Sequence, residues 1–489
     1  MRQSLLKFKI ANLGLGILCF IFGNISIQAA DLENVLSCSE FKTVARFIQK
    51  QHLRFQQLQD STSAINELLE SAKTSMPTTL RLLGYPFLAA QFENYRLAAF
   101  KKINAQSLDQ VCAFLETSTY RAAYLKSFAR ALDPYSDFYL NEELETKSSV
   151  VDGEFIGVGI GTDPKEDYLE ITEVVAEGPA HVKLKPADKI YKIDGYPVSG
   201  LNEMEIRQRI RGRIGTEVKF SISRDSQMID VTVVRDHIRQ PSVSFAWMKD
   251  RVLSIKLSRF FKPTASEVET ILAHEAPKAR GIILDLRNNP GGLLQAARDV
   301  VDLFITQGVV VYLKGKNVED QVWALRDGGY LNIPLVVLVN EGTASAAEIV
   351  AGALQDYGRA VVVGQKTYGK GSVQNIYETQ QILNTRYKGG MKLTTLWYYL
   401  PSGRSVKSLD PDVHVMAAEG EKVIPHPQMP YRGADQIEVA QLPLFGNRLA
   451  LNSKKMEKLS KTAKSSEEAG QALLLEKWAD FSSAHSLDQ

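Results

Sequence analysis

The sequence has little cysteine and no excess of either charge. Its 489 residues include three cysteines, too few for a disulfide-rich scaffold, and their spacing is not the paired spacing of a zinc site. The 58 Lys and Arg residues nearly balance 56 Asp and Glu residues, which gives a formal net charge of +2. Because this balance supplies no basic surface for a polyanion, a nucleic-acid partner is not expected.

The remaining composition is that of an ordinary globular chain. Hydrophobic residues make up 44% of it and charged residues 23%, which excludes a disordered chain, a collagen and a coiled coil. At roughly 100–200 residues per domain, the length suggests about three domains.

A long apolar run is present only near the N-terminus. Three basic residues within positions 2–9 precede the uncharged, mostly apolar stretch 10–27, which is the pattern of a secretory leader. The small pair Ala29-Ala30 offers a cleavage point. We therefore expect residues 1–30 to be a signal peptide and the protein to be exported, either to a periplasm or to a membrane surface facing outward. An uncleaved membrane anchor is the alternative.

Export changes what the two cysteines beyond the leader can do. An oxidising compartment permits a disulfide between Cys38 and Cys112. The alternative is a pair of buried free thiols. The sequence leaves both open.

The hydrophobic pattern divides the rest of the chain into regions. Apolar residues three to four apart predict a helical region over residues 31–145. Glycine-rich turns and short β runs predict a small β-rich module over 151–238. From 245 to 415, together with parts of 130–150, strands alternate with helices, which predicts an α/β layer. Residues 416–489 lose this periodicity and are interpreted as a C-terminal appendage.

The first glycine-rich turn of the α/β region, residues 288–292, follows a predicted strand and precedes a helix. Its glycines have an ordinary explanation, since a tight turn needs positive φ. Its backbone N–H groups at a helix start could instead hold negative charge on an oxygen. The turn lacks the glycine spacing of dinucleotide-binding folds and the Lys-Ser/Thr pair of a P-loop, so phosphate binding is disfavoured.

The second turn carries Ser345 at the start of a helix. Ser345-x-x-Glu348 fits a capping box, so the serine has a purely structural explanation. As a nucleophile it needs a base. None of the seven histidines lies between Gly281 and Gly389, which disfavours a Ser-His-Asp triad.

Lysine is the other available base, because burial disfavours the ammonium ion and lowers the lysine pKa. Lys370 lies between two glycines and precedes an extended run. If residues 370–374 are extended, Lys370 and Gln374 share a face, and the Gln374 amide can orient the amine. The alternative for Lys370 is a solvated loop lysine.

Five motifs, in order between about residues 132 and 415, resemble those of the carboxyl-terminal processing (tail-specific) serine peptidases. They are Asp285–Gly292, Val339–Ile349, Gly369–Gln374, Gly390–Thr395 and Pro401–Ser405 with Pro411–Val413. The resemblance implies a multidomain α/β protein, with a crotonase-like peptidase core and an inserted PDZ domain.

The resemblance also implies roles for individual residues. By motif position, Ser345 is the nucleophile, Lys370 the general base and Gln374 the group that orients the lysine. The backbone N–H groups of Gly291 and Ala346 form the oxyanion hole. No metal or organic cofactor is implied.

The module at 151–238 is similar to the PDZ domain of this family. PDZ domains hold a free C-terminal carboxylate with exposed N–H groups while a strand edge pairs with the peptide. The residues that match this element are Phe155, Ile156, Gly157, Val158 and Gly159.

These features predict an exported Ser/Lys endopeptidase that recognises the C-terminal tails of proteins or peptides and then processes or degrades them. Two other functional classes are alternatives. One is a non-catalytic PDZ scaffold that binds protein tails, and the other is a crotonase-type acyl-CoA enzyme, which has no need of a leader or a PDZ module. The resemblance adds a homodimer through the helical termini and an adaptor or activator protein as further partners.

Overall fold

A computed structural model describes most of the chain after the expected leader. The described residues are 36–52, 62–83, 85–104, 106–141, 143–144, 153–176, 178–199, 201, 206, 209–239, 241–315, 319–324, 329–384, 386–409, 411–414, 463 and 465–484. The expected signal peptide and most of the expected appendage lie outside them. None of the described helices is both long and apolar enough to span a membrane.

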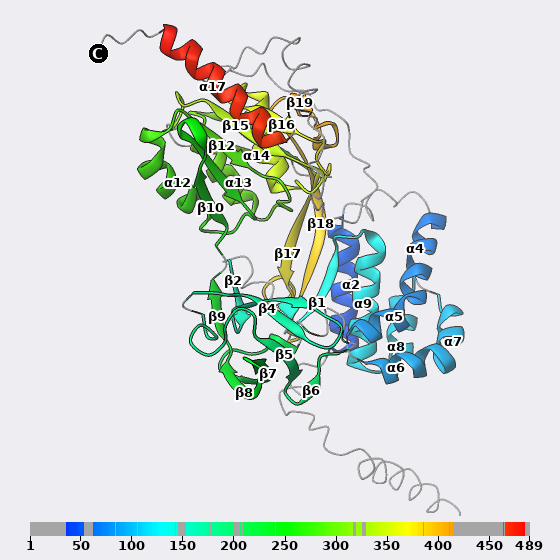
Figure 1. Cartoon of the computed structure of the whole chain (residues 1–489). Coiled ribbons are helices and arrows are strands. Elements are labelled where there is room, and N and C mark those ends of the chain that lie inside the picture. Colours follow the sequence, from blue (N-terminus) through cyan, green and yellow to red (C-terminus); the bar gives the residue numbers. More distant parts are fainter. Residues whose placement is uncertain are drawn as a thin grey trace, which may run out of the picture.

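The N-terminal region is helical and has its own hydrophobic core (Figure 1). Its helices are α2 (Cys38–Gln51), α4 (Thr62–Thr74), α5 (Met76–Leu82), α6 (Pro86–Gln91), a π-helical segment (Phe92–Arg96), α7 (Leu97–Lys101), α8 (Leu108–Phe114) and α9 (Ser118–Leu132). The apolar residues of α2 recur at helical spacing and are buried, as Phe41, Val44 and Ile48 illustrate.

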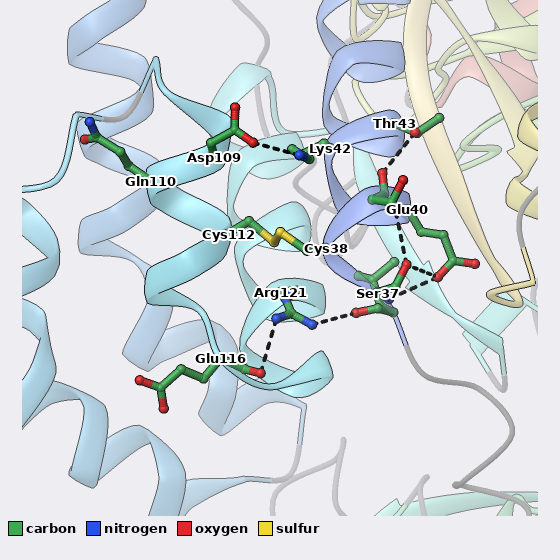
Figure 2. The surroundings of a disulfide bond; sticks show 12 residues. Ser37, Cys38, Glu40, Lys42, Thr43, Asp109, Gln110, Cys112, Glu116 and Arg121 are labelled. Carbon is green, nitrogen blue, oxygen red and sulfur yellow. Dashed lines mark hydrogen bonds and ion pairs between the residues drawn. A yellow bond between two sulfur atoms is a disulfide. The ribbon is translucent and has the colours of Figure 1, made fainter.

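A disulfide joins the first residue of α2, Cys38, to Cys112 of α8 (Figure 2). Of the two alternatives left open by the sequence, the structure has the bridge. Lys42 of α2 and Asp109 of α8 form an ion pair at 2.7 Å near the bridge. The start of α2 is therefore fixed to α8.

The β-rich module contains a six-stranded sheet with the order β3-β4-β5-β7-β8 and β6 paired to β5. A separate pair joins β2 to β9. The strands are β2 (Glu154–Gly157), β3 (Ile160–Pro164), β4 (Leu169–Val174), β5 (Lys189–Ile193), β6 (Tyr196–Pro197), β7 (Glu217–Arg224), β8 (Gln227–Val234) and β9 (Asp236–Arg239).

The main sheet of the α/β region has six strands in the order β10-β11-β12-β15-β16-β19. They are β10 (Val243–Trp247), β11 (Val252–Leu257), β12 (Gly281–Asp285), β15 (Leu335–Val339), β16 (Val361–Gly364) and β19 (Val413–His414). All neighbours are parallel except β10, which is antiparallel to β11. The central strands β12 and β15 are buried throughout, as expected of a sheet covered on both faces.

Helices cover both faces of this sheet. One face packs against α12 (Thr264–Glu275), α13 (Leu294–Asp302) and α14 (Ala346–Asp356). The other face packs against α17 (Ser466–Ala484), the helix near the C-terminus (Figure 1). Part of the segment interpreted as an appendage is therefore a layer of the core. Short 3₁₀ turns lie at Lys249–Arg251, Ala276–Lys278 and Val406–Ser408.

A second sheet connects the helical region to the α/β core. It contains β1 (Asp137–Leu140), β13 (Gly308–Lys314), β14 (Glu319–Ala324), β17 (Ser372–Glu378) and β18 (Gly389–Tyr399), and α15 (Thr379–Leu383) joins the last two to each other. The long strand β18 pairs with β1 at its beginning and with β13 at its end. It thus spans the distance between the two regions (Figure 1).

Candidate active site

Ser345 lies at the tight turn between β15 and α14. It has φ 57° and ψ −119°, a conformation that residues with a Cβ rarely adopt and that costs on the order of 1–3 kcal/mol. Such strain persists only where the surrounding structure enforces it. The turn presents Ser345 at the N-terminus of a buried helix.

The buried carboxylate of Glu348 holds this turn to the segment that carries Lys370. It accepts hydrogen bonds from the backbone N–H groups of Ser345 at 2.7 Å, Gly369 at 2.6 Å and Lys370 at 3.0 Å. The Thr367 hydroxyl donates a fourth bond at 2.7 Å. One side chain therefore holds the backbone of Ser345 close to the backbone of Lys370.

The Tyr398 hydroxyl makes a second connection between the same two residues. It lies within hydrogen-bond distance of the carbonyl oxygen of Ser345, at 3.2 Å, and of the carbonyl oxygen of Lys370. Burial raises the pKa of Tyr398 well above its usual value, so the hydroxyl remains neutral and able to donate.

The amine of Lys370 lies 4.5 Å from the centre of the Tyr135 ring. The Tyr135 hydroxyl is in turn 2.7 Å from the hydroxyl of Tyr368, which precedes Lys370 by two positions. The amine thus rests against an aromatic face contributed by the turn after α9, outside the main sheet. Lys370 is therefore not the solvated loop lysine that the sequence left as an alternative, because its amine packs against an aromatic ring.

Burial lowers the pKa of Lys370 to about 8, and the nearby charge of Lys392 contributes to the decrease. The carboxylates of Glu348 and Asp133 oppose it. A lysine with this pKa has a substantial neutral fraction near pH 8, which is what a general base requires. Burial also raises the pKa of Glu348 to about 7, although its four hydrogen bonds act in the opposite direction.

Gln374 lies in β17, but its described contacts differ from the sequence expectation. Its amide nitrogen donates to the hydroxyl of Ser372 at 3.0 Å and to the hydroxyl of Thr394 at 3.2 Å. The condition for a shared face, an extended run over residues 370–374, is not met: β17 begins at Ser372, and its register against β18 shifts between Val373 and Gln374. The orientation of the lysine amine by Gln374 stays a prediction.

The turn at 288–292 lies directly against the Ser345 turn. Gly291 has φ 94°. A Cβ at this position would lie 2.7 Å from the Ala344 oxygen, 2.8 Å from the Ser345 Cβ and 2.9 Å from the Ala346 nitrogen, so only glycine fits. The two predicted oxyanion donors are thus neighbours. In this structure the Gly291 N–H donates to the side-chain oxygen of Asn289 at 2.9 Å.

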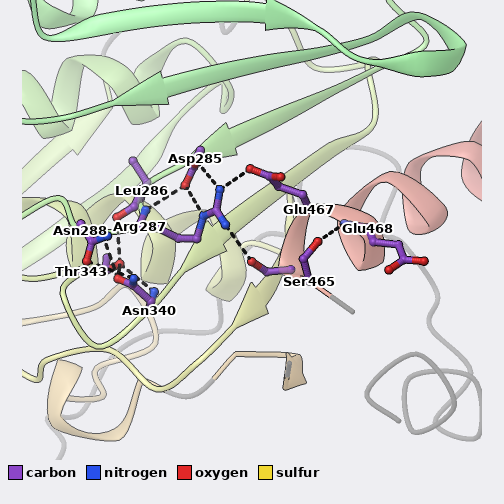
Figure 3. Close-up of polar contacts among 10 residues, drawn as sticks. Asp285, Leu286, Arg287, Asn288, Asn340, Thr343, Ser465, Glu467 and Glu468 are labelled. Carbon is purple, nitrogen blue, oxygen red and sulfur yellow. Dashed lines mark hydrogen bonds and ion pairs between the residues drawn. The ribbon is translucent and has the colours of Figure 1, made fainter. Parts of the chain in front are cut away.

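Polar side chains near the two turns hold them in position (Figure 3). The sequence did not single out these side chains as functional. The side-chain oxygen of Asn340 accepts a hydrogen bond from the backbone N–H of Asn288 at 2.9 Å. The side-chain nitrogen of Asn340 donates a hydrogen bond to the side-chain oxygen of Asn288 at 3.2 Å. Arg287 forms two bonds with Asp285, at 2.9 and 2.7 Å, and an ion pair with Glu467 of α17. The available sequence signal was an asparagine shortly after each of two neighbouring strands, Asn288 three positions after β12 and Asn340 directly after β15.

The predicted peptide-binding residues lie at the start of the β-rich module. Residues 155–157 form part of β2 and pair with β9. Val158 and Gly159, with φ 75° at the glycine, form the turn into β3. β3 is an edge strand of its sheet, and the Arg211 guanidinium lies 5.2 Å from the centre of the Phe155 ring.

No cluster of three or more His, Cys, Asp or Glu side chains within the described ranges could hold a metal ion.

Two family models match the chain. The model for peptidase family S41 matches residues 251–415, and the model for the PDZ domain matches residues 146–223. The first of these ranges contains Gly291, Ser345, Lys370 and Gln374.

Curated relatives match over most of their length. A probable CtpA-like serine protease of Staphylococcus aureus (strain N315) is 31% identical over 364 residues, which cover 69% of this chain and 71% of the relative. A carboxy-terminal-processing protease of Bartonella bacilliformis is 34% identical over 304 residues, which cover 60% of this chain and 68% of the relative. Among solved structures, the photosystem II D1 C-terminal processing protease matches with a TM-score of 0.44 and 20% identity, covering 78% of this chain and 93% of that one.

Proposed function

Because this chain belongs to the carboxy-terminal-processing serine proteases of peptidase family S41, we propose that it cleaves polypeptides with Ser345 as nucleophile and Lys370 as general base. The observation that carries the proposal is the Glu348 carboxylate, which accepts N–H bonds from both residues. The lowered pKa of Lys370 supports the role of base.

The chemistry proceeds in two stages. Neutral Lys370 takes the proton of the Ser345 hydroxyl as the oxygen attacks the scissile carbonyl carbon. The ammonium of Lys370 then gives the proton to the leaving amine, the peptide C–N bond breaks and an acyl-enzyme forms. Water, deprotonated by Lys370, attacks the acyl-enzyme and releases the new carboxyl terminus together with the free serine.

Developing negative charge on the carbonyl oxygen needs donors, and we assign this role to the N–H groups of Gly291 and Ala346. The Gly291 donor is engaged by Asn289 in the structure. On this proposal the Gly291 N–H exchanges the Asn289 oxygen for the substrate oxygen, so a local rearrangement of residues 288–292 accompanies catalysis.

We further assign substrate selection to the PDZ domain. PDZ domains bind peptide C-termini, and β3 is an edge strand that a peptide can extend by β-pairing. Val158 and Gly159 precede this strand and are suited to hold the terminal carboxylate with backbone N–H groups.

We also propose that the protein is exported. The leader pattern at 1–30 supports export, and the Cys38–Cys112 disulfide fits an oxidising compartment.

Two variants test the catalytic assignment. Ser345→Ala and Lys370→Ala should each abolish cleavage of a peptide ending in small apolar residues, while the far-UV circular dichroism and peptide binding stay as in the wild type. Binding without cleavage by the wild type would favour the non-catalytic scaffold. Wild-type turnover by either variant would contradict the assignment of that residue.

A further inference from the structure

A buried polar cluster that the proposed chemistry does not use lies close to Lys370. His52, Asp133 and Ser136 are all buried. The His52 Nε2 atom lies 2.5 Å from the Asp133 Oδ2 atom and 3.0 Å from the Ser136 hydroxyl. The Ser136 hydroxyl also donates to Asp133 at 2.7 Å. Burial of three polar side chains is costly unless all are hydrogen-bonded, so such clusters fix local geometry strongly.

We propose that His52 is a positioning residue for peptide cleavage: it fixes the turn at 133–136, and through that turn the surroundings of the Lys370 amine. This inference rests on the proposed role of Lys370 as the base. His52 itself does not contact the reacting atoms and acts through Asp133 and Ser136.

The first step of the argument is the turn itself. The Asp133 carboxylate accepts the backbone N–H groups of Tyr135 at 2.6 Å and Ser136 at 2.9 Å, in addition to its bonds from His52 and Ser136. Burial alone would raise the pKa of Asp133, but its hydrogen bonds and the electrostatic interaction with His52 outweigh burial and lower the pKa to about 2. Because an ionised carboxylate can only accept, the His52 Nε2 atom is the donor.

The second step leads from the turn to the amine. Tyr135 is the central residue of the turn, and its ring is the surface against which the Lys370 amine rests, 4.5 Å from the ring centre. Its hydroxyl contacts the Tyr368 hydroxyl at 2.7 Å. A displacement of the 133–136 turn would therefore move the aromatic face that locates the amine.

The third step follows a parallel route through β18. The Ser136 hydroxyl accepts the backbone N–H of Thr394 at 3.1 Å. The Thr394 hydroxyl in turn accepts a hydrogen bond from the side-chain nitrogen of Gln374, the residue predicted to orient the lysine. Two routes therefore lead from the 133–136 turn to the surroundings of Lys370, one through Tyr135 and one through Thr394.

The position of His52 is set by α2. The residue caps the C-terminal end of this helix, and its backbone N–H donates to the Ile48 oxygen at 2.9 Å. The opposite end of α2 is fixed by the Cys38–Cys112 disulfide (Figure 2). The helical region therefore does more than flank the peptidase core, because it delivers a buried donor to the site.

The test compares substitutions that remove or keep the donor. His52→Leu removes it, and His52→Gln keeps an N–H close to the place of Nε2. We expect His52→Leu to lower kcat about 10- to 100-fold, the range measured when a group that orients a functional residue is lost, with KM changed less than about twofold. His52→Gln should recover kcat to within about threefold of the wild type.

Ser136→Ala provides a second variant with a minimal change of volume, in case His52→Leu does not fold. It should lower kcat with little change in KM. The double variant should lose little more than the worse single variant, because His52 and Ser136 both act through the same 133–136 turn. Thr79→Val is the matched control. It removes a buried 2.7 Å contact to Ser127 within the same helical region and should lower thermal stability without changing kcat.

The outcomes separate this inference from the proposed function. Wild-type kcat in folded His52→Leu or Ser136→Ala overturns the inference, as does an equal loss in Thr79→Val, which would indicate a general effect of destabilisation. Failure of His52→Gln to recover kcat also counts against it. Peptide cleavage that survives Ser345→Ala, in contrast, would overturn the proposed function itself.

Discussion

At the scale of single residues, Glu348 has the most demanding position in the site. Its carboxylate is buried, accepts four hydrogen bonds and has a pKa raised to about 7 by burial. The four donors require an acceptor on both oxygens, whereas a glutamine would turn an NH₂ group toward some of them. The residue that fits a helix-capping box in the sequence therefore also holds the backbones of Ser345 and Lys370 together.

Replacement Glu348→Gln should lower kcat about 10- to 100-fold, since a buried N–H that loses its acceptor costs roughly 1–3 kcal/mol. Steady-state peptide cleavage measures the effect.

Thermal melts at different pH values test the raised pKa of Glu348. Because the folded pKa of Glu348 lies above its ordinary value of 4.5, its contribution to stability is present at low pH and is lost as pH rises toward about 7. The wild type should thus lose stability relative to the variant between pH 4.5 and about pH 7.

The pKa of Lys370, lowered to about 8 by burial, predicts the pH dependence of cleavage. On the proposed mechanism only the neutral amine accepts the serine proton, so kcat/KM should rise about tenfold per pH unit below pH 8 and level off above it. The charge of Lys392 helps to lower this pKa, so Lys392→Gln should move the midpoint to higher pH. Lys388→Gln, an exposed lysine just before the same strand, is the control. An unchanged midpoint in Lys392→Gln would contradict the electrostatic explanation.

At the scale of secondary-structure elements, the Cys38–Cys112 bridge is the feature with the clearest energetic consequence. It joins residues 74 positions apart, and closure of a loop of that length in the unfolded chain stabilises the folded state by about 4 kcal/mol. The helical region should depend on it more than the α/β core, which has a separate hydrophobic core.

The double variant Cys38→Ala/Cys112→Ala should therefore unfold at lower denaturant concentration, with a loss of about 2–5 kcal/mol in the free energy of unfolding. A reducing agent should have a similar effect on the wild type and none on the double variant. Equal stability of the oxidised and reduced wild type would show that the bridge does not stabilise the fold.

The elements also show which parts of the structure can be predicted from sequence. The strands β12 and β15 are buried throughout and, except for Asp285, apolar, and glycine- or asparagine-rich turns follow them. The α/β layer and the two turns of the candidate site can therefore be predicted from the local sequence. The bulge between Val373 and Gln374 is set by pairing with β18 and has no local signal. The contacts of Lys370 with Tyr135 and Tyr398 join distant segments, and for this reason the motifs alone did not indicate them.

At the scale of the whole molecule, the site is assembled from three regions. Ser345 and Glu348 come from the α/β core, Tyr398 from the strand that leaves it and Tyr135 from the turn after the helical region. The C-terminal helix α17 adds a fourth contribution, because Glu467 pairs with Arg287 immediately before the 288–292 turn (Figure 3).

This arrangement predicts that α17 is required for the stability of the core. Leu474 is buried and packs against Gly281, where an added Cβ would lie 2.9 Å from its side chain. Leu474→Ala should lower the free energy of unfolding by about 2–5 kcal/mol, as for other buried leucines. Glu468→Ala, an exposed position on the same helix, should change it by less than about 0.5 kcal/mol. Chemical denaturation measures both. If Leu474→Ala were as stable as Glu468→Ala, α17 would be a dispensable appendage, because a layer that truly covers the sheet cannot lose a buried leucine without cost.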